Sequence, residues 1–358
     1  MSEPLETWID AAIGETREVL VREGKPIALR IVRASDEGRR ARWGEQYAGR
    51  VTSVDRRLRG MFVNLGLKGA QGFLPLNADG SAGRDHAILS EGANIVVSVA
   101  REAARDKSAV LQLVAQRDEG APRRLAQHEC DMDLAVAKPA DAETRERIDE
   151  LIEASLARSV PIPGGGALII EPTAALVAID VDAGGRTGSA DPENFARSLN
   201  VAAAVEAARQ IRLRNLGGVI AIDFVAMRSN IARNFLDGVV RSGFLHDPWS
   251  VQFGHLSRFG IFELGRAQVR TPLHEQLCDA DGRLSAETIA LMGLRAIERE
   301  GRGATSRQIA CTVAPDVMAW LEAAPFDWRS ALDARLGPRW KIEGSSAISR
   351  EKIETRAL

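Results

Sequence analysis

Two apolar stretches of the chain each run directly into an aspartate. Residues 177–180 are Val-Ala-Ile-Asp, and residues 220–223 are Ile-Ala-Ile-Asp. If these stretches form neighbouring strands, their ends coincide and the carboxylates of Asp180 and Asp223 meet. Two like charges at this distance raise each other's pKa, and a divalent cation such as Mg²⁺ removes that penalty. The pattern indicates either a metal site that activates water beside a phosphate or, as the plainer alternative, two strand-end residues that cap loops.

Asp182 lies two residues beyond Asp180 and leads into Gly184 and Gly185. Its carboxylate is either a third metal ligand or a hydrogen-bonding partner of the glycine turn, and the sequence leaves both roles open. The five histidines show no spacing typical of metal ligands.

A second group of chemically useful residues is the basic segment 39–73. Eight basic residues against two acidic ones, Glu45 and Asp55, give it a net charge of +6, whereas the whole chain has a net charge of -2. The basic residues are Arg39, Arg40, Arg42, Arg50, Arg56, Arg57, Arg59 and Lys68, and the aromatic residues among them are Trp43, Tyr47, Phe62 and Phe73. Basic side chains attract phosphates and exposed aromatic rings stack on unpaired bases, so we favour binding of RNA or single-stranded DNA. The alternative is a solvated basic face with Phe62 and Phe73 in the core.

A third group is formed by Arg258, Arg266 and Arg270, within the stretch HLSRFGIFELGRAQVR. We predict that Arg266 and Arg270, four residues apart, share one face of a helix and contact phosphates near the acid pair. The alternative is that they form surface ion pairs with acids such as Glu263.

The elements that must position these residues follow from the periodicity. Residues 15–33 alternate around a Gly-Lys-Pro turn and predict a hairpin. Short β-rich runs in 46–76 and two strands in 94–114 predict a small antiparallel barrel of the OB type, the kind that binds oligonucleotides. Residues 116–131, QRDEGAPRRLAQHECD, lack periodicity and are interpreted as a linker.

The remainder of the chain predicts two α/β regions. A strand, helix, strand order over 167–227 indicates a layered α/β domain, preceded by a helix at 141–160 and followed by one at 231–245. The long helix after Asp191 is expected to end at a capping glycine pair, Gly217 and Gly218. A small C-terminal α/β unit is expected to contain a helix at 285–300, a strand near 308–313, helices within 314–336 and a strand at 339–343.

Composition bounds the class of protein. A chain of 358 residues with 45% hydrophobic and 27% charged residues suits two or three globular domains. No apolar run approaches the roughly 18 residues that span a bilayer, and the first residues do not resemble a secretory leader. Cys130, Cys278 and Cys311 lie far apart. We therefore expect a cytoplasmic protein with free thiols and no membrane partner.

Together these stretches resemble the ribonuclease E/G family. IPGGGALIIEPTAALVAIDVDAGG is similar to the family's glycine-rich strand entry and first catalytic aspartate, and NVAAAVEAARQIRLRNLGGVIAIDF to its helix and second catalytic aspartate. LSRFGIFELGRAQVR resembles the segment that follows, and YAGRVTSVDRRLRGMFVNLGLKGAQGFLPL resembles an S1-type RNA-binding barrel. The resemblance covers most of residues 15–115 and 145–275.

The resemblance implies a mixed α+β protein in which an S1-type (OB-fold) β-barrel is inserted near the N-terminus of an α/β, DNase I-like and RNase H-like catalytic core, followed by a small C-terminal α/β domain. The implied boundaries are an N-terminal hairpin at 1–38 that packs, with 116–162, as a reduced RNase H-like part, the barrel at 39–115, the DNase I-like domain at 163–275, a linker at 276–284 and the C-terminal domain at 285–358.

The activity implied is Mg²⁺-dependent hydrolysis of single-stranded RNA by an endoribonuclease of RNA processing or decay, with Mn²⁺ as a substitute ion. Asp180 and Asp223 fall on the family's metal-binding aspartates, and Asp182 falls where the family usually has an asparagine near the metal. Phe62, Phe73 and Lys107 fall on barrel positions that grip RNA.

The chain departs from the family in two places. No subdomain that senses a 5′-monophosphate follows the barrel, so we expect cleavage independent of the RNA's 5′ end. The family's zinc-binding cysteine link is replaced by CDADGRL at 278–284, so we expect no structural zinc and no tetramer, and leave a monomer or a homodimer through the C-terminal domain open. The alternative function is a non-catalytic RNA-binding protein acting on ribosomal RNA or ribosome assembly. A DNA nuclease is disfavoured by the barrel type.

Overall fold

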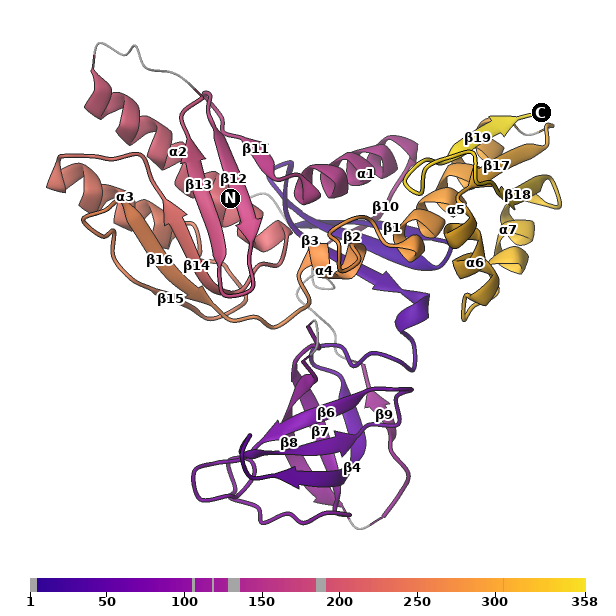
Figure 1. Ribbon diagram of the computed structural model, residues 1–358, viewed down its shortest axis with the longest axis horizontal. Coiled ribbons are helices and arrows are strands. Elements are labelled where there is room, and N and C mark those ends of the chain that lie inside the picture. The colour runs from indigo at the N-terminus through magenta and orange to yellow at the C-terminus, as the bar shows by residue number, and fades with distance from the viewer. Residues whose placement is uncertain (1–4, 105–106, 118, 128–135, 185–190, 305) are drawn as a thin grey trace. The chain divides into compact units, whose positions relative to one another are not determined.

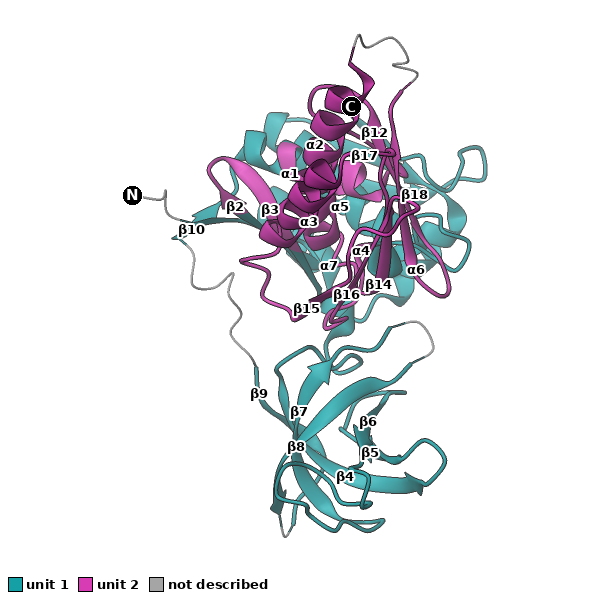
Figure 2. Ribbon diagram, turned by 90° about the vertical axis from the view of Figure 1, so that its left-hand side faces the viewer, with its two compact units in different colours: residues 1–20, 30–146, 274–358 teal, residues 21–29, 147–273 magenta. Residues whose placement is uncertain are grey.

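The computed structural model describes residues 5–104, 107–117, 119–127, 136–184, 191–304 and 306–358 of a mixed α+β protein (Figure 1). The chain divides into two compact units (Figure 2). Unit 1 comprises residues 1–20, 30–146 and 274–358, and unit 2 comprises residues 21–29 and 147–273. Within the described ranges, no helix is long and apolar enough to cross a membrane.

The predicted barrel forms in unit 1. Its strands are β4 (Gln46–Asp55), β5 (Gly60–Asn64), β6 (Gln71–Pro75), β7 (Asn94–Arg101), β8 (Ala109–Arg117) and β9 (Arg123–Ala126). They are ordered β5-β6-β8-β7-β4-β9, and an additional pairing of β5 with β4 closes five of them into a barrel of the OB type. Alternate residues, such as Met61, Val63 and Leu74, fill its interior. The barrel prediction is confirmed.

The remaining elements of unit 1 come from both ends of the chain. The N-terminal sheet has the order β10-β1-β2-β3. Its strands are β1 (Glu6–Ala12), β2 (Glu15–Arg22), β3 (Lys25–Arg33) and β10 (Val136–Pro139), and a short 3-10 turn, η1 (Ala34–Asp36), follows. The hairpin prediction for 15–33 is confirmed, whereas the prediction of a linker over 116–131 is wrong where β9 forms. Residues 128–135 lie outside the described residues.

The C-terminal elements match the predicted order, with one strand added. They are α4 (Leu273–Leu277), α5 (Ala286–Gly303), β17 (Ile309–Val313), α6 (Pro315–Ala323), α7 (Trp328–Leu336), β18 (Trp340–Gly344) and β19 (Glu354–Ala357). The sheet order is β18-β17-β19, and β19 was not predicted. Ile13, from the turn between β1 and β2, belongs to the same hydrophobic core as Ile289 of α5 and Cys311 of β17.

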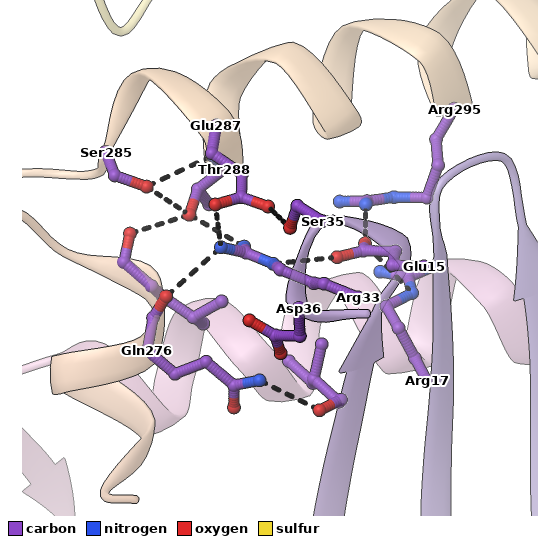
Figure 3. Close-up of polar contacts among 12 residues, drawn as sticks. Glu15, Arg17, Arg33, Ser35, Asp36, Gln276, Ser285, Glu287, Thr288 and Arg295 are labelled. Atoms are coloured by element: carbon purple, nitrogen blue, oxygen red, sulfur yellow. Dashed lines mark hydrogen bonds and ion pairs between the residues drawn. The ribbon is translucent and has the colours of Figure 1, made fainter. Parts of the chain in front are cut away.

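A buried polar cluster centred on Arg33 joins the two ends of the chain within unit 1 (Figure 3). The Arg33 guanidinium donates to Thr288 Oγ1 at 2.8 Å and to the carbonyl of Gln276 at 3.1 Å, and lies 3.5 Å from Glu15 Oε2. Glu15 also pairs with Arg295 of α5. Because a charge buried alone is costly, the pairing of these opposite charges fixes β2 and β3 against α5.

Unit 2 is a layered α/β structure built on one six-stranded sheet. Its strands are β11 (Ser159–Pro161), β12 (Ala167–Pro172), β13 (Val177–Asp182), β14 (Gly218–Asp223), β15 (Val251–Phe253) and β16 (Ile261–Arg266), and its helices are α1 (Ala142–Leu156), α2 (Pro192–Leu213) and α3 (Asn230–Ser242). The sheet order is β11-β12-β13-β14-β16-β15, with β13 and β14 parallel.

Helices α2 and α3 cover one face of this sheet. Ile179 of β13, Ile222 of β14 and Phe262 of β16 are almost fully buried and share a core with Ala207 of α2 and Leu236 of α3. Because side chains alternate along a strand, the residues between these buried ones point to the other face. Asp180, Asp182 and Asp223 belong to that exposed set.

The end of α2 differs from the prediction. The helix ends at Leu213, Arg214 is its C-cap, and Asn215 takes the left-handed conformation, with φ of 50°. An asparagine therefore replaces the expected glycine pair as the helix terminator. Gly217 and Gly218 lie beyond it and lead into β14, where Gly217 leaves room for Gln268.

Candidate functional site

The acid pair lies at the ends of two adjacent parallel strands. β13 and β14 pair with Asp180 directly opposite Asp223. In-register residues of parallel neighbours point to the same face of a sheet, about 4.8 Å apart along the hydrogen-bonding direction. Both side chains are exposed, on the face opposite the helices. The prediction that the two strand ends coincide is confirmed.

The electrostatics of the pair reflect this placement. Partial desolvation raises the pKa of Asp180, and repulsion from Asp223 and then Asp182 raises it further. The ionised form of Asp180 is therefore disfavoured in the isolated protein. A cation held between the carboxylates would reverse the sign of this effect.

The donor set fits an open site for a hard divalent cation. Carboxylate oxygens are the ligands that Mg²⁺ prefers, and Mg²⁺ is usually held by one or two of them with water and phosphate oxygens completing its shell. Among the described residues, no three His, Cys, Asp or Glu side chains converge into a complete ligand cluster. The pair therefore suits an ion that is shared with a substrate better than a closed structural ion.

Asp182 serves the turn after β13. Its Oδ1 accepts a hydrogen bond of 2.9 Å from the backbone N–H of Gly184, which is the turn role that the sequence left open. Gly185, the other predicted turn residue, lies outside the described residues. The charge of Asp182 is also close enough to raise the pKa of Asp180, so the turn bond and a role beside the cation are compatible.

The loop after Asp223 is fixed by two side chains of α2. Asn200, which is fully buried, donates to the carbonyl of Val225 at 2.7 Å and accepts from its N–H at 3.0 Å. Glu193 accepts from the N–H groups of Arg228 and Ser229, at 3.1 and 2.9 Å. These bonds lower the pKa of Glu193. Neither residue was singled out from the sequence, although an asparagine at the start of the alanine-rich run of α2 was a usable signal.

A tight turn between β15 and β16 adjoins the acid pair. Asp223 lies opposite Ile261, and the N–H of Phe224 donates to the carbonyl of Gly260 at 3.1 Å. Gly260 has φ of +92°, and a Cβ placed there would lie 3.0 Å from the Phe224 carbonyl. The close approach therefore requires glycine. Arg258 lies in this turn and is exposed.

The predicted helix carrying Arg266 and Arg270 is wrong. Arg266 is the last residue of strand β16, opposite Gly218 at the other end of β14 from Asp223. Its buried guanidinium donates to Asp247 at 2.9 Å and to the Leu216 carbonyl at 2.8 Å, so it stabilises the sheet. Arg270, in the segment after β16, stacks over Trp249, with 5.5 Å from Cζ to the ring centroid.

The barrel places Phe62 and Phe73 on its outer surface. They are cross-strand partners on β5 and β6, with ring centroids 5.6 Å apart in an edge-to-face arrangement. Both rings are half-buried, whereas the neighbouring Met61 and Leu74 face the interior. A Cβ added at Gly60 would lie 2.0 Å from the tip of the Phe73 ring, so the Phe73 ring packs over Gly60 only because this residue has no side chain. The two rings thus form an aromatic surface outside the core.

Other members of the basic segment have divided roles. Tyr47 is buried, and its hydroxyl donates to Glu45 at 2.6 Å, which makes it a core residue. Arg56, Arg57 and Arg59 are exposed on the turn between β4 and β5. Lys107 is exposed in the turn before β8, three residues from Val110, the partner of Phe73. The exposed cations and the aromatic surface therefore belong to one barrel.

The segment in place of a cysteine-rich link forms a closed turn. Cys278 and Leu284 make an isolated β-bridge, and Asp279 Oδ1 accepts the N–H groups of Asp281 and Arg283 at 3.0 and 3.1 Å. Cys278 and Cys311 are free thiols, and burial raises the pKa of Cys311 to about 12. Cys130 lies outside the described residues.

Sequence comparisons agree with this geometry. A family model described as the Ribonuclease E/G family matches residues 81–269, more than half of the chain. The chain is 33% identical to ribonuclease E of Escherichia coli K12 over 182 residues, which are 49% of this chain and 17% of that protein. It is 37% identical to a chloroplastic ribonuclease E/G-like protein of Arabidopsis thaliana over 147 residues, 39% of this chain and 15% of that protein.

A further relative is ribonuclease G of Haemophilus influenzae, 29% identical over 215 residues, 58% of this chain and 44% of that protein. The chain therefore spans less than half the length of each of these relatives. The matched residues include the second half of the barrel, the strands that carry Asp180 and Asp223, and the turn that contains Arg258. The chain belongs to the ribonuclease E/G family.

Proposed function

We propose that this protein is an endoribonuclease that hydrolyses single-stranded RNA with Mg²⁺, in RNA processing or decay. The observation that carries the proposal is the in-register pairing of Asp180 with Asp223 at the exposed ends of parallel strands. Family membership supports it, because the matched relatives are named ribonuclease E and ribonuclease G. Unit 2 then corresponds to the DNase I-like catalytic domain and the barrel to an S1-type domain.

Each part of the site has a role in this proposal. Asp180 and Asp223 would hold the ion, whose chemistry is to activate water and to stabilise charge on the phosphate, and Mn²⁺ would substitute for it. Asp182 holds the turn beside the pair and contributes negative charge. Phe62 and Phe73 offer ring surfaces to unpaired bases, and Lys107 and Arg258 offer positive charge to the phosphates.

The proposal extends to regulation and assembly. Cleavage is independent of a 5′-monophosphate, since the chain has no stretch resembling the family's sensor subdomain between the barrel and α1. The turn at Cys278 contains one cysteine, so we propose that the protein has no structural zinc. We also propose that it acts in the cytoplasm, either as a monomer or as a homodimer formed through the C-terminal elements.

A cleavage assay tests the proposal. A fluorescent single-stranded RNA and the DNA of the same sequence are incubated with the protein and Mg²⁺, with and without excess chelator. We expect RNA products that disappear with chelator and no DNA products. RNA binding without products would favour a non-catalytic RNA-binding protein of ribosomal RNA or ribosome assembly, and equal cutting of DNA would contradict the substrate assignment.

A further inference from the structure

Phe259 is an exposed aromatic residue beside the acid pair. Its side chain is 71% exposed, although phenylalanine is usually buried and aromatic residues make up only 5% of the chain. It follows Arg258 at the tip of the turn between β15 and β16, and neither residue contributes to the core of unit 2. A ring kept in solvent at this position needs an explanation other than packing.

The turn that carries Phe259 is held at many points. Ser257 accepts from the N–H of Gly260 at 3.1 Å through its carbonyl, and donates its own N–H to Ile261 at 2.9 Å. Its hydroxyl oxygen accepts from the N–H groups of Phe259 and Ile261, both at 3.3 Å. Arg233 of α3 donates to the carbonyls of Leu256 and Ser257, at 3.2 and 2.6 Å. The ring is therefore presented by a supported turn.

This turn is also tied to the catalytic strand. A Cβ placed at Gly260 would lie 3.8 Å from Oδ1 of Asp223, and the Gly260 carbonyl accepts the N–H of Phe224 at 3.1 Å. The backbone next to Phe259 is thus hydrogen-bonded to the residue after Asp223, the aspartate that we assign to the ion. A nucleotide with its phosphate at the acid pair would have its neighbouring base within reach of the turn.

The Arg258 guanidinium defines the chemistry of the ligand. Its Cζ lies 4.7 Å from the centroid of the Phe259 ring, so a cation covers one face of the ring. The two side chains together present a flat π-surface and a positive charge, the combination that binds an unpaired base with its phosphate. Stacking on a ring face does not depend on base identity, so this surface would select unpaired nucleotides over a particular sequence.

We propose that Arg258 and Phe259 form a stacking platform for one unpaired nucleotide next to the scissile phosphate, separate from the ring pair of the barrel. This inference rests on the proposed function. It makes Phe259 a positioning residue, which orders the strand at the acid pair and so discriminates against paired RNA.

The test compares Phe259→Ala, Phe259→Trp and a matched control, Phe235→Ala, which removes another exposed ring of unit 2, 56% exposed, on α3. We expect Phe259→Ala to raise the KM for single-stranded RNA about tenfold with little change in kcat, the loss of one stacked base. Phe259→Trp restores the KM, and Phe235→Ala leaves it unchanged. All three variants should melt at the wild-type temperature.

The same variants are assayed on oligonucleotides with one abasic position, moved stepwise along the strand. At the position that stacks on Phe259, the abasic RNA and Phe259→Ala should each weaken binding. Their effects on binding should not add, because both remove the same stacking contact. Phe62→Ala should show this behaviour at a different position. If Phe259→Ala cleaves every substrate with the wild-type KM, the platform does not exist.

A binding readout separates failure of this inference from failure of the proposed function. The Asp223→Asn protein is mixed with RNA that carries 2-aminopurine at the identified position, or at each position in turn. The 2-aminopurine fluorescence should be quenched when the RNA binds, and adding Phe259→Ala should remove the quenching. If the wild-type protein cuts no RNA but quenching depends on Phe259, the nuclease assignment is wrong and the platform stands. If cleavage occurs and quenching is unaffected by Phe259→Ala, only the platform is wrong.

Discussion

Asp180 is energetically unfavourable in its ionised form, which is not expected of a residue that only stabilises the fold. Desolvation and the charges of Asp223 and Asp182 raise its pKa, so its ionised form destabilises the folded protein. A carboxyl group whose folded pKa is raised stabilises the fold at pH values below its ordinary pKa and loses that contribution as the pH rises through the folded value. At neutral pH the two carboxylates therefore repel each other, and a bound cation would relieve this repulsion.

Replacement of Asp180 by asparagine should stabilise the metal-free protein at neutral pH. We expect a gain of about 0.2–1 kcal/mol, the usual size of an interaction between exposed charges. Thermal melting in chelator checks the sign. Added Mg²⁺ should raise the melting temperature of the wild-type protein but not that of Asp180→Asn, whereas destabilisation by the substitution in chelator would show that the carboxylate serves the fold.

The paired rings of the barrel give a second test at the residue scale. Phe62→Ala and Phe73→Ala should each weaken single-stranded RNA binding by about 1–3 kcal/mol, measured by fluorescence anisotropy, because each removes a stacking surface. The melting temperature should change little. The control is Met61→Ala, because Met61 lies on the same strand as Phe62 but is only 2% exposed. This substitution should lower the free energy of unfolding by about 2–5 kcal/mol. A loss of folding in the phenylalanine variants instead would assign both rings to the core.

At the scale of elements, the apolar strands of the buried cores were predictable, whereas the mostly exposed strands β9, β10 and β19 and the segments between strands were not. The apolar runs ending at Asp180 and Asp223 predict strands because burial on one face dictates their pattern. Arg266 was placed on a helix because a four-residue spacing of arginines suits a helix face, but pairing of β16 with β14 overrides this local preference. The roles of Glu193 and Asn200 depend on backbone groups 25 to 36 residues away in the sequence, which no local pattern reveals.

The loop after β14 should depend on Glu193. The backbone N–H groups of Ser229 and Arg228 lower the pKa of Glu193. Its contribution to the stability of the fold is therefore present above its ordinary pKa and is lost as the pH falls through its pKa in the folded protein. Glu193→Gln should speed hydrogen exchange at Arg228 and Ser229 and reduce kcat. The wild-type loop should loosen in the same way as the pH falls below the ordinary pKa of a glutamate, after correction for intrinsic rates. Unchanged exchange in the variant, with α3 as internal reference, would contradict this anchor.

At the scale of the whole molecule, the chain combines a barrel that carries exposed cations with a sheet that carries two aspartates at the ends of neighbouring strands. The family match ends at residue 269, before the C-terminal elements that share a core with Ile13. RNA affinity should come largely from the exposed cations of the barrel and therefore fall steeply with salt.

A comparison of RNA ends tests the organisation of the whole chain. One RNA is prepared with a 5′-monophosphate and with a 5′-hydroxyl, and both are cleaved under the same conditions. We expect equal kcat/KM for the two, because the proposed function does not include recognition of a 5′-monophosphate. A preference of tenfold or more for the monophosphate would show that another part of the protein performs this recognition.

The central claim is that Asp180 and Asp223 together hold the ion that cuts RNA, and Asp223→Asn tests it most directly. Cleavage and binding of one single-stranded RNA are measured with Mg²⁺ for the wild-type protein, for Asp223→Asn and for Glu171→Gln, an exposed carboxylate on the same sheet that pairs with Arg158. We predict that Asp223→Asn abolishes cleavage and retains RNA binding, while Glu171→Gln retains both. Cleavage by Asp223→Asn at the wild-type rate would contradict the account.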